Sequence, residues 1–185
     1  AVTRASFRLD GIDVSDRDAR TALAGGASAR ALGPRQAARL RAHAAILRRI
    51  ERQGWGDGPL PPVEVRRWHS ALLNGLPAAD PDDATARRLA HVCFRLSTPH
   101  RRLRPAVEEV ARLHVDLLAD PLVPSFNGIL ARLLLSAHLA RVGLPPVRFD
   151  VERDREPPRD PAAFALRLKE LIVASLDEVA AAVRG

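Results

Sequence analysis

The feature that most constrains the fold is an apolar run in the second half of the chain. Residues 127–142 read NGILARLLLSAHLARV, and apolar side chains occupy nearly every side of a helix built from them. Gly143, Pro145 and Pro146 follow at once. Glycine commonly ends a helix and proline cannot continue one. A helix that is apolar almost all round is buried among other elements. The run therefore predicts a buried helix at the centre of a helical bundle.

The other apolar residues also recur at helical spacing, and no period-2 strand of useful length is visible. Proline opens several segments and glycine closes them, as is typical of helices. Ser15 and Asp18 have the spacing of a capping box ahead of a short helix. We therefore expect an all-α fold. The further helices are expected over residues 34–54, 63–74 and 84–96, from Pro105, and after a cap at Asp160.

Length and cysteine content suggest one domain in a reducing compartment. The chain has 185 residues, which fits a single domain over residues 1–185. Cys93 is the only cysteine, so no disulfide can form within the chain, and a cytoplasmic location is expected. No apolar run reaches the roughly 20 residues that span a bilayer, so no membrane partner is expected.

The formal charge of +7 raises the question of a nucleic-acid partner. Almost all basic residues are arginine, with Lys169 the only lysine, a pattern that a GC-rich gene also produces. Aromatic residues for base stacking are scarce. Nucleic acid is therefore disfavoured, and the expected partner is an unidentified protein or a small anionic ligand.

The start of the apolar helix has the chemistry of an anion site. The first N–H groups of a helix have no partner within it, and the helix dipole makes this end positive. Asn127 and Gly128 open the helix, and Arg132 lies about one turn inside. We interpret Asn127, Gly128 and Arg132 as candidate anion-binding residues. The simpler alternative, that Asn127 only caps the helix and Arg132 pairs with an acidic neighbour, stays open.

Three segments in order resemble the Fic/Doc family. They are residues 6–11 (SFRLDG), 68–75 (WHSALLNG) and 120–146, which contain the apolar helix. In active Fic proteins the third segment reads HPFxDGNGRxxR, and here Asn127, Gly128 and Arg132 stand at matching places. The resemblance implies a Fic-like helical bundle with its core at 34–146 and a carboxy-terminal helix at 160–185. It also implies an ancestral transfer of AMP, or a related phosphate-bearing group, to a protein hydroxyl.

The catalytic part of that motif is missing. An ungapped alignment puts Pro121 at the motif His, Ser125 at the Mg²⁺ ligand, Phe126 at the first Gly and Ile129 at the first Arg. One inserted residue would instead place Asp120 at the His. Neither alignment supplies a base with a pKa near neutrality, and the metal loses its carboxylate. We therefore expect a degenerate Fic-fold protein that has lost nucleotidyl transfer and acts by binding an anion or a protein.

An alternative is a repurposed enzyme on the same scaffold, acting without Mg²⁺ or the motif His. Its candidate catalytic residues are Asp120 and His114, because the segment that contains His114 leads directly into the motif loop. No His-x-x-x-His or paired Cys/His spacing is present, so no metal site is expected. No cofactor is expected either, although ATP or another nucleotide remains open as a ligand.

The amino-terminal segment, residues 1–26, contains a stretch similar to the Fic inhibitory motif [S/T]xxxE[G/N]. In family members that Glu bonds the second motif Arg. Here Ser6 begins the stretch and Asp10 replaces the Glu, one methylene shorter. The resemblance implies that Ser6 and Asp10 form an inhibitory-type tie with Arg132.

The remaining histidines and the cysteine fall in apolar surroundings. His43 and His114 lie on apolar helical stripes and are interpreted as core or boundary histidines. His69 follows Trp68, and we expect it to be packed and hydrogen-bonded. Cys93 is expected to be buried rather than reactive.

Overall fold

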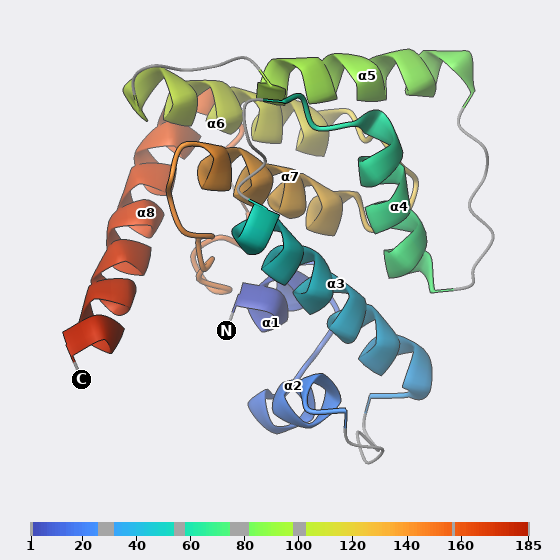
Figure 1. Ribbon diagram of the computed structural model, residues 1–185, viewed down its shortest axis with the longest axis vertical. Helices are drawn as coiled ribbons and strands as arrows, with labels where there is room; N and C mark the ends of the chain where they lie inside the picture. Colours follow the sequence, from blue (N-terminus) through green and yellow to red (C-terminus); the bar gives the residue numbers. More distant parts are fainter. Residues whose placement is uncertain are drawn as a thin grey trace.

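The structure is a computed structural model that describes residues 2–25, 32–53, 58–74, 82–97, 103–156 and 158–184. Every regular element in these residues is an α-helix, which confirms the all-α prediction (Figure 1). In chain order the described helices are α1 (Val2–Leu9), α2 (Asp16–Leu23), α3 (Pro34–Gln53), α4 (Pro62–Leu73), α5 (Asp83–Ser97), α6 (Leu103–Ala119), α7 (Asn127–Arg141) and α8 (Pro161–Arg184).

Local capping explains where several helices begin. Ser15 Oγ accepts a hydrogen bond from Asp18 N at 3.1 Å, which confirms the cap expected ahead of α2. Asp160 Oδ2 accepts from Ala163 N at 2.8 Å at the start of α8. Helix α6 begins two residues before Pro105. A proline is tolerated there because the first-turn N–H groups have no partner within the helix.

The apolar run forms α7, and its side chains are enclosed. All residues from Ile129 to Leu139 are buried, including the polar ones. Helix α7 lies between α3 and α6 and also contacts α1 and α5 (Figure 1). Because other helices pack against α7 on several sides, the apolar side chains all round it are kept out of water. A helix on the surface would leave part of them exposed.

Helix α8 packs along α6 at its start and then extends past the body of the molecule (Figure 1). Phe164, Leu168 and Leu171 face inward and are buried. The loop that precedes the helix is fixed by Asp154, which accepts hydrogen bonds from Arg167 Nε at 2.7 Å and Nη2 at 3.1 Å. This carboxylate is buried, its arginine partner is partly buried, and the pair joins the loop to α8.

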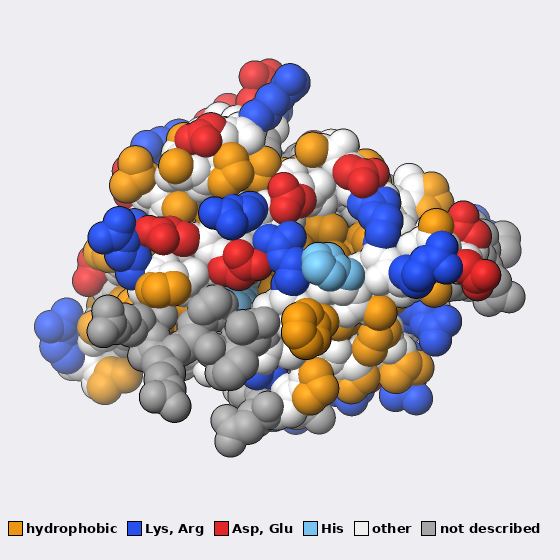
Figure 2. All heavy atoms as spheres, turned by 90° about the horizontal axis from the view of Figure 1, so that it is seen from above, with side chains coloured by type: hydrophobic (Ala, Val, Ile, Leu, Met, Phe, Trp, Pro, Cys, Tyr) orange, Lys and Arg blue, Asp and Glu red, His pale blue; other side chains and the backbone are white. Residues whose placement is uncertain are grey.

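The surface formed by α5 and α6 has mixed charge. Figure 2 views this face and shows acidic and basic side chains next to one another rather than a patch of one sign. Arg95 illustrates the pattern, since it pairs with Glu109 at 2.7 Å and with Asp116 at 3.2 Å. Within the described part of the chain, no helix combines the length and apolar character needed to cross a membrane.

Candidate anion site at the start of α7

The loop before α7 is tied to α6 through Asn127. Its Oδ1 accepts from Leu122 N at 2.9 Å, and its Nδ2 donates to Leu117 O at 2.7 Å. Phe126, not Asn127, is the N-cap residue, and it makes no side-chain capping bond. The simpler alternative, in which Asn127 only caps the helix, is therefore wrong on this point. Its amide bonds the backbone on the carboxyl side of α6 and in the loop, so it holds the loop in place.

Basic side chains from α4 and α5 fix the same loop through its carbonyl groups. His69 Nε2 lies 3.1 Å from Ser125 O, which accounts for the hydrogen-bonded role expected of this histidine. Arg88 Nη2 donates to Asp120 O at 2.8 Å, and Arg88 also pairs with the Asp120 carboxylate at 2.7 Å. Partial burial lowers the pKa of His69, and the hydrogen bond to Ser125 opposes this shift. The loop is thus positioned from three sides.

Phe126 takes a backbone conformation that usually requires glycine. Its φ is +60°, in the left-handed region where a side chain is strained. The Arg39 guanidinium lies 4.7 Å from the centre of the Phe126 ring, within the range of a cation–π contact. Arg39 Nε also donates to Leu72 O at 3.0 Å. Phe126 therefore combines a glycine-like backbone with a ring packed against an arginine.

Arg132 reaches from α7 to α1. Its Nε donates to Ser6 Oγ at 2.8 Å, its Nη2 donates to Ser6 O at 2.6 Å, and the same nitrogen pairs with the Asp10 carboxylate. The residue is 8% exposed. Burial lowers the pKa of Arg132, and the neighbouring Asp10 opposes that shift. The structure thus brings Ser6, Asp10 and Arg132 together in the way that the inhibitory-type motif implied.

The Asp10 carboxylate also binds the start of α7. Its Oδ2 accepts from Ile129 N at 3.2 Å, one of the first N–H groups of the helix. A Cβ on Gly128 would lie 2.6 Å from Asp10 Oδ1, closer than real Cβ contacts allow. Gly128 therefore leaves the space that the carboxylate fills. A guanidinium and a helix amino terminus together hold an anionic group, and that group is a carboxylate of the same chain.

The charge of Arg132 also acts on two buried histidines. Burial lowers the pKa of His43 and of His114 to about 3 each, and the Arg132 charge adds to this effect. His43 Nδ1 lies 3.2 Å from Thr3 Oγ1. His114 is stacked on Phe164 at 4.8 Å between ring centres. Both histidines are therefore neutral at pH 7, and their placement in the core is as expected.

The two candidate catalytic residues do not come together. His114 is 3% exposed, and its Nδ1 has no hydrogen-bond partner among the described residues. The Asp120 side chain is 75% exposed and paired with Arg88 at the surface. A buried imidazole with a pKa of about 3 is a poor proton acceptor for a substrate near pH 7. Among the residues that the structure describes, His114 and Asp120 therefore form no acid–base pair at the loop.

Sequence reasoning did not single out Arg39 as part of this site. It lies on a helix among many other arginines, and nothing in its spacing distinguishes it. Cys93 was expected to be buried, and it is 1% exposed. Burial raises the pKa of its thiol to about 12.

The described residues contain no group of three or more His, Cys, Asp or Glu side chains arranged to hold a metal ion. Comparison of the chain with family models, with curated proteins and with solved structures finds no match.

Proposed function

We propose that this chain is a degenerate Fic-fold protein that binds an anionic ligand or protein group at the start of α7 and transfers no nucleotide. The supporting observation is the buried Arg132, whose guanidinium and the nearby Ile129 N–H hold the Asp10 carboxylate. Such a pair of donors suits a phosphate or carboxylate. Asp10 is then the internal occupant that an external anion replaces.

Loss of transfer chemistry is supported by the residues around the loop. Pro121 and Ser125 supply neither a base nor a carboxylate ligand. Asp120 is held on the surface by Arg88, and His114 is enclosed. What remains is binding, because Arg132 and the first turn of α7 need no proton transfer to hold an anion. ATP is a suitable probe, since its outer phosphates carry the required charge.

The test is calorimetric titration with ATP, in the presence and absence of Mg²⁺. We expect Asp10→Ala to bind ATP at least about tenfold more tightly than the parent, because the competing carboxylate is gone. Asp10→Asn is the milder variant, which removes the competing charge and keeps a hydrogen-bonding group. Arg132→Ala should abolish binding, and Mg²⁺ should have little effect.

Asp13→Ala is the matched control, because Asp13 is an exposed carboxylate on the same segment. It should bind ATP as the parent does. The proposal is wrong if neither Asp10 variant binds more tightly than the parent, if Arg132→Ala binds as well as the parent, or if binding requires Mg²⁺.

A further inference from the structure

The two oxygens of the Asp10 carboxylate have separate donors. Oδ1 pairs with Arg132 Nη2, and Oδ2 accepts from Ile129 N at 3.2 Å. Ser6 holds the guanidinium in place, since its Oγ accepts from Arg132 Nε at 2.8 Å and its carbonyl oxygen accepts from Nη2 at 2.6 Å. The donors of the site are thus arranged for a planar group with two oxygens.

The space at this position has the size of a carboxylate. A Cβ on Gly128 would lie 2.6 Å from Asp10 Oδ1 and 3.3 Å from Asp10 Cγ, so a single added carbon would already crowd the group. A phosphoryl group has at least one oxygen more than a carboxylate. It would fit only if the space beside Gly128 became wider.

The charge around the site also matches a single negative charge. Among the described residues, Arg132 is the one side chain that forms an ion pair with Asp10. His43 and His114 add no charge near pH 7, because the pKa of each is about 3. The start of α7 contributes roughly half a positive charge. A phosphomonoester carries about −1.5 to −2 at pH 7, and the excess negative charge would be costly beside a buried guanidinium.

The carboxylate lies at the open edge of the site. The Asp10 side chain is 17% exposed, whereas that of Arg132 is 9% exposed. We infer that the anion exchanged at this site is a monocarboxylate, which fit and charge favour over a phosphate. The inference rests on the proposed function, in which an external anion replaces Asp10. ATP tests whether an anion can enter, and a comparison of small anions tests which class the site prefers.

Thermal unfolding of Asp10→Ala at pH 7 and constant ionic strength tests the preference, with acetate and inorganic phosphate as probes. The shift that each anion causes in the parent is subtracted, because phosphate stabilises proteins in general. Half-maximal stabilisation should require at least about tenfold less acetate than phosphate. Adding Arg132→Met should abolish the acetate effect. N-acetyl-aspartic acid amide tests the source: if it acts as acetate does, an acidic side chain of a partner can enter, and if only acetate acts, the ligand is a small free acid.

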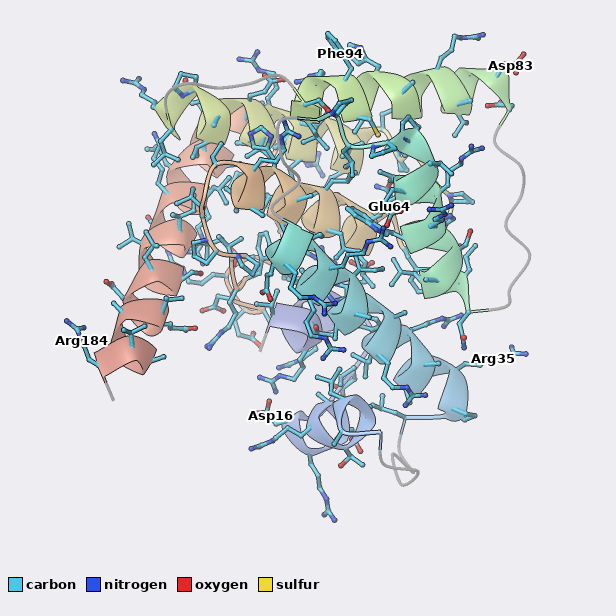
Figure 3. All side chains as sticks on the ribbon, in the orientation of Figure 1. Asp16, Arg35, Glu64, Asp83, Phe94 and Arg184 are labelled. Carbon is cyan, nitrogen blue, oxygen red and sulfur yellow. The ribbon has the colours of Figure 1, made fainter. Side chains whose placement is uncertain are left out.

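Glu64→Ala is the matched control for loss of a buried carboxylate. Figure 3 labels Glu64 on α4, and the residue is 4% exposed. Its partners Arg49 and Arg67 have side chains that are 45% and 68% exposed. Water therefore hydrates these guanidinium groups when the carboxylate is removed. Acetate should stabilise Glu64→Ala no more than it stabilises the parent.

Two results separate this inference from the proposed function. Phosphate that acts at the same concentration as acetate, or at a lower one, would overturn the carboxylate preference and leave anion exchange intact. If neither anion stabilises Asp10→Ala more than the parent, exchange itself is wrong, and the inference fails with it. Equal stabilisation of Glu64→Ala by acetate would also overturn it. Asp10→Asn serves in the same experiment if Asp10→Ala does not fold, and acetate should again act at lower concentration than phosphate.

Discussion

Two Asp–Arg pairs in this molecule share the same chemistry and differ in what surrounds them. Arg132 and Asp10 are 122 residues apart and join α7 to α1. Arg167 and Asp154 are 13 residues apart and join α8 to the loop before it. Hydrogen bonding to Asp154 raises the pKa of Arg167, whereas burial lowers the pKa of Arg132.

The difference teaches that an ion pair alone does not indicate a binding site. Asp154 accepts two bonds from Arg167, and Asp150 N also donates to it at 2.6 Å, so it closes a local turn. Asp10 instead lies at the amino end of a buried helix, over a glycine that leaves room for it. Both carboxylates accept a backbone N–H, but of the two only Asp10 lies at the amino end of a buried helix with a glycine that leaves room for an anion.

The largest expected effect is on the free energy of unfolding, which should fall further when Asp10 is removed than when Asp154 is removed. Asp10→Ala leaves the buried Arg132 charge without its counter-ion, and the free energy of unfolding should fall by about 3–5 kcal/mol. Asp154→Ala should cost only about 1–3 kcal/mol, because Arg167 keeps Glu170 at 2.8 Å as a partner. Urea unfolding measures both. Equal losses would remove the distinction between the pairs.

Lowering the pH should destabilise the folded protein through the two buried histidines near Arg132, which are His43 and His114. The pKa of His114 is about 3 in the folded protein and near 6.5 when unfolded. The unfolded chain therefore binds more protons below pH 6.5, and stability falls as pH falls. Each such histidine should remove about 2 kcal/mol between pH 7 and pH 5.

Replacing the imidazole tests this directly. His114→Phe keeps a ring against Phe164 and should remove about 2 kcal/mol of that acid loss, as judged from urea unfolding at the two pH values. An unchanged pH dependence would show that His114 takes up its proton in the folded state as readily as in the unfolded chain.

A double-mutant cycle tests whether Gly128 is needed to leave space for the Asp10 carboxylate. Gly128→Ala should cost about 1–3 kcal/mol in the parent, because its methyl group displaces the Asp10 carboxylate. In an Asp10→Ala background the same change should be neutral or slightly stabilising, since alanine favours helix. The two changes should therefore be coupled by about 1–3 kcal/mol. Additive effects would mean that the carboxylate does not depend on this space.

The smallest effect concerns Phe126 and compares two substitutions of one residue. Phe126→Gly and Phe126→Ala both remove the ring and its contact with Arg39. Only glycine relieves the left-handed backbone, so the glycine variant should be more stable than the alanine variant by about 1 kcal/mol. Thermal unfolding of the pair gives the difference. Equal stability would argue against strain at this turn.

The sequence anticipates the helices well, because periodic apolar residues and Pro or Gly boundaries act locally. The contact of Asp10 with Arg132 was accessible only through the motif resemblance, since 122 residues separate the two. The alternative that made Asn127 a cap is wrong, because an Asn at a helix start resembles a cap until the path of the loop is known. Contacts of Arg88 and His69 with loop carbonyls depend on how distant helices are oriented, and no local pattern encodes that.

The enclosed thiol of Cys93 gives the protein an internal reporter. A thiol whose pKa is raised to about 12 has almost no thiolate at neutral pH, and it is 1% exposed. Alkylating reagents therefore reach it only in molecules that have opened. With no second cysteine in the chain to confuse the signal, the labelling rate counts opening events of the native, unmodified sequence.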